Sequence, residues 1–174
     1  MIENDKCQGL RAQVAPDVRV LVLGSMPGVA SLEQQRYYAH PRNRFWPLME
    51  ALAGVPADLE PASRVRALLA ARIGLWDVVG SCTRRGSLDA SIVRGSEVAN
   101  PLPELLGTLP GLRLIACNGQ TALSLFRRLV VPALPADLPV PVVGLPSTSP
   151  ANAAMSLPKL VEAWHPVGAA LGPA

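Results

Sequence analysis

The densest group of chemically versatile side chains lies in the heptapeptide HPRNRFW, which begins at His40. The amide of Asn43 can orient a water molecule or pair with the edge of a base, and Phe45 can stack on a base. Arg42 and Arg44 can bind phosphates. The structural alternative is a helix that Asn43 caps and whose core face carries Phe45 and the following tryptophan. For Asn43 the two interpretations are compatible.

Polar residues also interrupt or follow two apolar runs that are typical of buried strands. Asp77 lies within LWDVV, and a carboxylate there requires a partner or a position at the strand end. It can pair with Arg84 or Arg85 of the basic segment GSCTRRGS, or it can contact a substrate, and the sequence favours neither. Asn118 follows LRLIAC and can read a ligand through its amide, or make an Asx turn before the next helix.

Two further segments have the composition of ligand-binding loops. The turn GSMPG, residues 24–28, permits a close approach of the backbone to a ligand, but it is neither GxGxxG nor a P-loop, so ATP binding has no support. Ser147, Thr148 and Ser149 offer hydroxyl and backbone N–H groups to a phosphate near a helix start, or they cap that helix.

A set of alternating elements must position these segments. Apolar runs predict strands at 18–24, 75–79, 112–117 and 140–145, and residues 25–43 are expected to form a long loop. Helical patterns predict helices at 44–53, 63–73, 102–109 and 120–131, and from the 147–152 loop to about residue 170. This alternation predicts an α/β layered fold with a mostly parallel sheet. Because each cluster follows a strand, we expect all of them at the ligand-binding carboxyl edge of that sheet.

Length and composition set the class of protein. The chain has 174 residues, 49% of them hydrophobic and 17% charged, which excludes a disordered chain and a coiled coil. We expect one domain over residues 1–174 with a polar N-terminal tail of about residues 1–15. No apolar run reaches the ~18 residues of a membrane span, and the polar start lacks a signal segment. We therefore expect a cytoplasmic protein without a membrane contact.

The charged residues and the cysteines restrict the chemistry. The net charge of +3 permits a nucleic-acid partner if the positive groups cluster. Lys6 and Lys159 are the only lysines, which leaves two candidates for Schiff-base chemistry. The three cysteines lie far apart, which does not favour a disulfide framework or a structural zinc site. They are also too few for a four-cysteine iron–sulfur cluster.

The motifs together resemble the uracil-DNA glycosylase superfamily. GSMPG, SLEQQRYYAHPRNRFW, GLWDVVGSCTRRGSLD, CNGQTA and LPSTSPAN are most similar to its hypoxanthine (deoxyinosine) DNA glycosylase branch, and HPRNRFW is close to the mismatch-specific uracil/thymine-DNA glycosylases. The resemblance covers roughly residues 18–165. It implies a three-layer αβα sandwich with a central four-stranded, mostly parallel sheet. It also implies a monofunctional enzyme that flips a deaminated base, hypoxanthine and/or uracil, out of DNA and hydrolyses its N-glycosidic bond in base excision repair. We expect this enzyme to be a monomer that requires no cofactor or metal and is associated with the nucleoid when bound to DNA.

The sequence departs from the family pattern at two positions. Relatives that excise uracil carry Asp or Asn before the proline of the first motif, where this chain has Met26. Many relatives have His before Pro-Ser in the last motif, where this chain has Leu145, unless the alignment slips and residues 149–150 take the place of 146–147. In the hypoxanthine branch the asparagine of HPRN supplies the water contact, which implies Asn43 as the catalytic residue.

The resemblance and the residue types assign the remaining roles. We expect base binding by Ser25, Met26, Tyr38, Phe45, Asp77 and Asn118. We expect phosphate binding by Arg42, Arg44, Arg84, Arg85, Ser147, Thr148 and Ser149. The alternatives are a non-catalytic nucleic-acid-binding module, which the departures from the family pattern favour, and a hydrolase of free nucleosides, which would have a closed pocket and no basic face.

Overall fold

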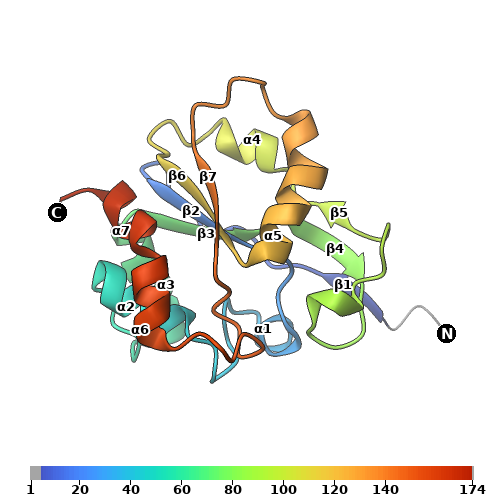
Figure 1. Cartoon of the computed structure of the whole chain (residues 1–174), viewed down its shortest axis with the longest axis horizontal. Coiled ribbons are helices and arrows are strands. Elements are labelled where there is room, and N and C mark those ends of the chain that lie inside the picture. Colours follow the sequence, from blue (N-terminus) through green and yellow to red (C-terminus); the bar gives the residue numbers. More distant parts are fainter. Residues whose placement is uncertain (1–4, 174) are drawn as a thin grey trace.

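A parallel sheet forms the centre of the structure, a computed structural model that describes residues 5–173. Its strands are β2 (Val20–Gly24), β3 (Ile73–Asp77), β6 (Leu114–Asn118) and β7 (Val142–Leu145). They lie in the order β3-β2-β6-β7, and all three pairings are parallel (Figure 1). Every residue of β2 and β6 is buried, as expected for strands covered on both faces. The predicted four-stranded parallel sheet is confirmed.

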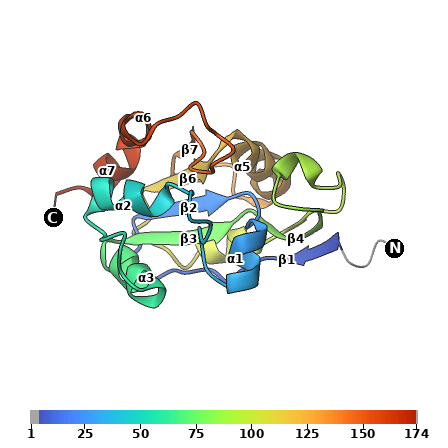
Figure 2. The same cartoon turned by 90° about the horizontal axis from the view of Figure 1, so that it is seen from below.

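Helices cover both faces of this sheet. One face packs against α2 (Phe45–Ala53), α3 (Pro61–Ala70), α6 (Leu157–Ala163) and α7 (His165–Leu171), and the other against α4 (Leu102–Leu106) and α5 (Gln120–Leu125). Val20 and Val22 belong to the first core, and Leu21 and Leu23 belong to the second, because successive side chains of a strand point to opposite faces. Figure 2 shows the strands side by side, and the helices on their two faces make the predicted αβα sandwich.

A second, smaller sheet lies beside the first and was not predicted. It consists of β1 (Lys6–Gln8), β4 (Val79–Thr83) and β5 (Val98–Ala99), which pair antiparallel in the order β1-β4-β5. Residues 6–8 were expected in a polar tail, whose residues 1–4 lie outside the described part, and residues 80–83 were expected in a loop. These strands are short and partly exposed, so only their long-range pairing reveals them.

Several helices differ from their predicted bounds. The expected loop 25–43 contains α1 (Val29–Gln34), and α3 begins at Pro61 rather than at Ser63. The predicted helix 120–131 consists of α5 followed by a π-helical turn, η3 (Phe126–Val130). The last helix is divided into α6 and α7, because Pro166 lacks the N–H group that a continuous helix requires.

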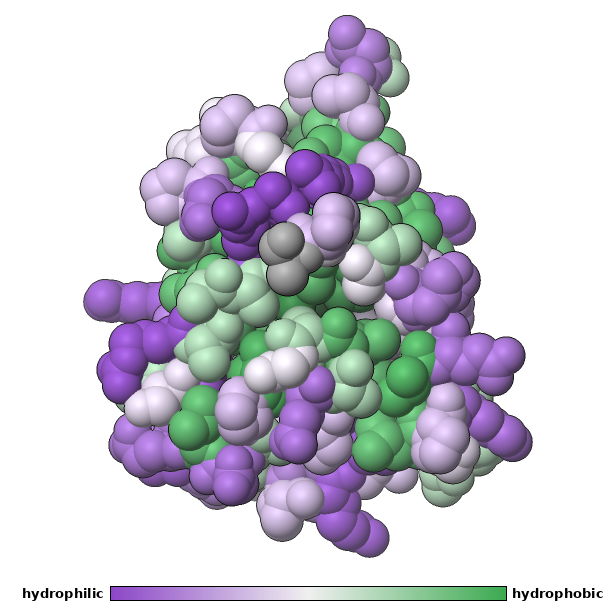
Figure 3. Space-filling view, turned by 90° about the vertical axis from the view of Figure 1, so that its left-hand side faces the viewer, coloured by the Kyte–Doolittle hydropathy of each residue, from purple (hydrophilic) through white to green (hydrophobic). Residues whose placement is uncertain are grey.

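The outward surface of the first helical layer mixes apolar and hydrophilic side chains (Figure 3). Among residues 5–173, no helix is long and apolar enough to cross a membrane.

Candidate active site

A pocket of about 470 Å³ lies at the carboxyl ends of the parallel strands. It is lined by residues 24–31 after β2, by Asp77 and Asn118 at the ends of β3 and β6, and by residues 147–152 after β7. Tyr38, His40 and Asn43 and the segment 87–90 complete the wall. The sheet brings these segments together, because Gly24 pairs with Asp77 in the parallel register and Asn118 pairs with Leu145. The site lies at the edge that the sequence predicted.

Asp77 forms the floor of the pocket. Its side chain is buried, and its Oδ1 lies against the backbone of Gly24, where a Cβ atom would overlap it. Its Oδ2 has no hydrogen-bond partner among the described residues. Burial, followed by the negative charge of Asp89, raises the pKa of Asp77 to about 7. The carboxyl group is therefore protonated in acidic solution and about half protonated near neutrality.

Asp89 is a second carboxyl group in the pocket lining and was not predicted as a site residue. Its Oδ1 accepts a hydrogen bond from Ser25 Oγ at 2.7 Å, and burial raises its pKa. Arg84 is buried next to this pair, donates to the carbonyl oxygen of Pro27, and lowers the pKa of both carboxyl groups. The expectation that Arg84 binds a DNA phosphate is therefore wrong, because its guanidinium group points into the protein.

Asn118 connects β6 to the loop after β7. Its Nδ2 donates to Thr148 Oγ1 at 3.0 Å and to Tyr38 Oη at 3.2 Å, and its Oδ1 accepts the N–H group of Thr148. Both amide protons are used within the protein, so Asn118 positions the loop and offers no free N–H group to a base. Thr148 is buried and its N–H group is occupied, which contradicts its predicted contact with a phosphate.

Arg44 fixes the same loop from the side of α2. Its Nη2 donates to the carbonyl oxygens of Ser149 and Asn152, and its backbone N–H donates to the carbonyl oxygen of Thr148. The predicted phosphate contact of Arg44 is therefore replaced by contacts that shape the pocket wall. The loop is also not at a helix start, because α6 begins only at Leu157.

Tyr38 presents an aromatic ring to the pocket. It stacks on Phe45 with 3.9 Å between the ring centroids and 19° between the ring planes. Phe45 is fully buried and does not line the pocket, so it supports Tyr38 and cannot itself stack on a base. Tyr38 has a φ of 53°, a left-handed conformation that is uncommon for a non-glycine residue.

Asn43 lies at the pocket wall, one residue before Arg44, the N-cap of α2. Its Oδ1 accepts the N–H group of Phe45 at 3.0 Å, which satisfies a donor at the helix start. The oxygen keeps a second lone pair, and Nδ2 has no protein partner among the described residues. The prediction that Asn43 is the cap residue is wrong, because Arg44 takes that position, but Asn43 still satisfies the first N–H group of the helix. It also offers polar atoms at the pocket, where Ser25 and Met26 lie.

The predicted arginines do not form one exposed group. Arg42 and Arg85 are exposed, and Arg85 pairs with Asp5 at 3.2 Å. Ser147 and Ser149 line the pocket and are half-buried. Within residues 5–173, no group of three potential metal ligands lies together.

Known proteins share both the sequence and the fold. The sequence profile of the Uracil DNA glycosylase superfamily matches residues 12–167. A hypoxanthine DNA glycosylase of Methanosarcina acetivorans is 37% identical over 116 residues, which are 66% of this chain and 72% of the relative. A protein of the same name from Methanosarcina barkeri is 36% identical over 118 residues, with the same coverage of 66% and 72%.

A solved structure extends this similarity to nearly the whole chain. The solution NMR structure of a candidate uracil DNA glycosylase from Methanosarcina acetivorans superposes with a TM-score of 0.78 and 31% sequence identity. The match covers 97% of this chain and 99% of that one. The resemblance inferred from the motifs is confirmed, and the chain belongs to the uracil DNA glycosylase superfamily.

Proposed function

We propose that this DNA glycosylase removes hypoxanthine from deoxyinosine in DNA, with uracil as a second substrate, and so initiates base excision repair. The observation that carries the proposal is the pocket, in which Asn43, Tyr38 and Asp77 meet at the carboxyl edge of the sheet. The relatives named hypoxanthine DNA glycosylase favour this substrate. A base inside duplex DNA reaches such a pocket only after it is flipped out of the stack.

Asn43 is the proposed catalytic residue. Glycosidic cleavage passes through an oxocarbenium-like sugar, so the enzyme must mainly position a water molecule and hold the departing base. Asn43 has a free lone pair and a free Nδ2 at the pocket, with which it can orient this water. The water oxygen bonds to C1′ and loses a proton, while the electron pair of the broken bond leaves with the base. Met26 occupies the place of the side chain that holds the water in other branches and has no polar group suited to this task.

The base is held by one ring and one neutral acid. The exposed face of Tyr38 can stack on it, and the protonated carboxyl group of Asp77 can donate to an acceptor on its edge. Hypoxanthine has such acceptors at O6, N7 and N3. Ser25 also lines the pocket, but its hydroxyl group donates to Asp89.

Contacts to the DNA backbone are proposed for residues on the pocket rim and nearby surface. Arg42 and Arg85 are exposed, and the hydroxyl groups of Ser147 and Ser149 can donate to phosphate. Neither Lys6 nor Lys159 lines the pocket, which favours hydrolysis over Schiff-base lyase chemistry. We propose that the enzyme acts as a monomer inside the cell, where its DNA substrate lies.

The test uses duplexes that each contain one hypoxanthine, uracil or xanthine. The protein is added in excess, and alkali then converts abasic sites to strand breaks. We expect breaks at hypoxanthine, fewer at uracil, and no breaks before alkali is added. Duplexes that remain intact in all three cases overturn the proposed activity and leave a binding module, whereas breaks before alkali overturn the monofunctional mechanism. Release of base from free deoxyinosine at the same rate as from DNA would indicate a nucleoside hydrolase.

A further inference from the structure

A second cavity, of about 480 Å³, shares Tyr37 with the pocket described above but has no part in the proposed reaction. It lies between residues 34–36 at the end of α1 and residues 60–66 at the start of α3. Its charged lining residues are one acid, Glu60, and three arginines, Arg36, Arg64 and Arg66. A hollow lined by an excess of positive charge concentrates anions.

Arg64 is held in a fixed position at this second cavity. Its guanidinium group lies over the ring of Trp46, 4.6 Å from the centroid, and its Nη1 donates to the carbonyl oxygen of Ala57 at 3.2 Å. Its Nε is buried and has no partner among the described residues, and its Nη2, which is not buried, also donates to none of them. Arg64 therefore keeps free donors at the cavity, on a side chain whose orientation is already set.

Arg36 adds a second positive charge from the segment after α1. Burial, followed by the positive charge of Arg36, lowers the pKa of Arg64. In residues 5–173, no ion pair within 4 Å joins a carboxylate to Arg36, Arg64 or Arg66. The repulsion between these like charges is therefore not relieved by a paired acid, and a bound anion would offset it.

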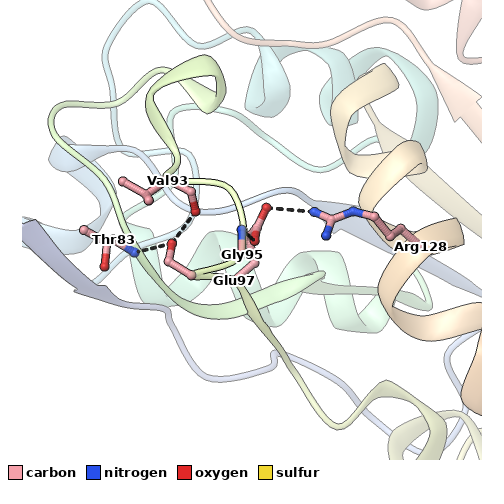
Figure 4. A network of polar contacts seen from close by, with 6 residues as sticks. Thr83, Val93, Gly95, Glu97 and Arg128 are labelled. Carbon is pink, nitrogen blue, oxygen red and sulfur yellow. Dashed lines mark hydrogen bonds and ion pairs between the residues drawn. The ribbon is translucent and has the colours of Figure 1, made fainter.

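Arginines in other parts of the chain do have an acidic partner. Arg128 of η3 pairs with Glu97 at 2.7 Å, and Glu97 also accepts the N–H group of Gly95 (Figure 4). Arg85 pairs with Asp5 in the same way. Because the arginines of the second cavity lack such a partner among the described residues, their charges remain available to a ligand.

We propose that the second cavity binds a phosphate group. Guanidinium groups present paired N–H donors that match two phosphate oxygens. The amide groups of Gln13 and Gln34 also line the cavity. In the described part of the chain no side chain caps α3, which begins at this cavity, and a helix start favours a negative charge. The phosphate belongs either to the backbone of DNA or to a free phosphate monoester, and the experiment separates these sources.

Calorimetric titration with inorganic phosphate, at constant ionic strength and with chloride as the reference anion, tests the site. We expect the wild type to bind phosphate and Arg36→Gln to weaken the affinity about tenfold or more, because it removes a charge-assisted contact. Arg64→Gln should have a similar effect, and Arg36→Lys should retain part of the affinity because the charge remains. Arg127→Gln is the matched control, since it removes the same charge from an exposed arginine of η3 that lines neither cavity. Melting temperatures show whether each variant is folded.

Binding to an undamaged duplex distinguishes the two sources of the phosphate. If the site takes a phosphate of the DNA backbone, Arg36→Gln should reduce the dependence of log affinity on log salt by about one contact, and Arg127→Gln should not. If the site takes a free monoester, this dependence should be the same in all variants, and ribose 5-phosphate should compete with inorganic phosphate.

Two results overturn the proposal. One is a wild type that binds phosphate no better than chloride, together with a salt dependence that Arg36→Gln leaves unchanged. The other is phosphate binding that survives in both Arg36→Gln and Arg64→Gln. Neither measurement requires release of a base, so the outcome is independent of the proposed glycosylase reaction.

Discussion

The carboxyl group of Asp77 occupies the space that a side chain at residue 24 would require. Its Oδ1 overlaps the position of a Cβ atom built on Gly24, and the two residues are register partners in neighbouring parallel strands. Glycine at the end of β2 therefore permits an acid at the end of β3. The floor of the pocket depends on both residues together.

Gly24→Ala should displace Asp77 and lower both stability and activity. Overpacking of a filled site costs about 1–3 kcal/mol, measured as the free energy of unfolding in urea. The cost should fall when Asp77 is also changed to Ala, because the overlapping atoms are then gone. Additive effects of the two substitutions would contradict the contact.

Asp77→Asn should change how stability depends on pH. The pKa of Asp77 is about 7 in the folded protein and 3.8 as its ordinary value, so the folded state holds the proton longer than the unfolded state. Wild-type stability should therefore fall as pH rises from about 4 to about 7, by up to the order of 4 kcal/mol from this group. Asp77→Asn removes this loss, so its free energy of unfolding relative to wild type should increase over that range.

The control for this measurement is Asp58→Asn, which alters an exposed acid far from the pocket lining. Its stability relative to wild type should show no comparable rise with pH. The same proton should govern activity, because only the protonated carboxyl group donates to the base. We expect the rate on hypoxanthine to fall above about pH 7 in the wild type and to lose this dependence in Asp77→Asn. A rate that rises through pH 7 would contradict the role of a neutral Asp77.

Asn43→Ala should reduce the chemical step by about a hundredfold or more, in the range found when one preorganised polar group is removed. Binding of hypoxanthine-containing DNA should remain, since Asn43 acts on the water. Asn43→Ser separates this role from capping, because its hydroxyl oxygen can still accept the N–H group of Phe45. Single-turnover rates and melting temperatures distinguish the two roles. Full activity of Asn43→Ala would remove Asn43 from the mechanism.

Arg42 and Arg44 should give opposite signatures. Arg42→Gln should weaken DNA binding without sequence preference and reduce the slope of log affinity against log salt by about one, as expected for one phosphate contact. Arg44→Gln should mainly lower the free energy of unfolding, because the carbonyl groups of Ser149 and Asn152 lose their donor. An unchanged stability of Arg44→Gln would show that these hydrogen bonds are dispensable.

The sequence predicted the sheet and the site edge because both follow from local composition. Strands such as VLVLG are buried on both faces and stay apolar, and parallel strands place their carboxyl ends together. The burial of the Arg84 side chain could not be predicted, because an arginine in the polar, basic segment GSCTRRGS is expected to be exposed. Only the return of this segment onto Pro27 buries its guanidinium group.

Two other differences have the same origin in long-range contacts. Tyr38 and Phe45 are both aromatic and only seven positions apart, and their order from the pocket depends on how α2 packs. Asn118 lies at the pocket as predicted, but its amide is bonded to Thr148, 30 positions later in the chain, and to Tyr38, 80 positions earlier. The types of side chain thus predicted where the site lies. The hydrogen-bond partner of each polar atom could be identified only from the folded structure.

The loop at residues 147–152 owes its shape to side chains that precede it by 30 to 108 positions, namely Asn118 and Arg44. Hydrogen bonds within the loop, such as that from Asn152 Nδ2 to the carbonyl oxygen of Ser147 at 3.0 Å, therefore account for only part of its conformation. Exchange of residues 147–152 alone between family members should distort this wall of the pocket. Exchange of the loop together with Asn118 and Arg44 should preserve it. Engineering of the substrate range must therefore change the 147–152 loop, the asparagine at the end of β6 and the arginine before α2 together.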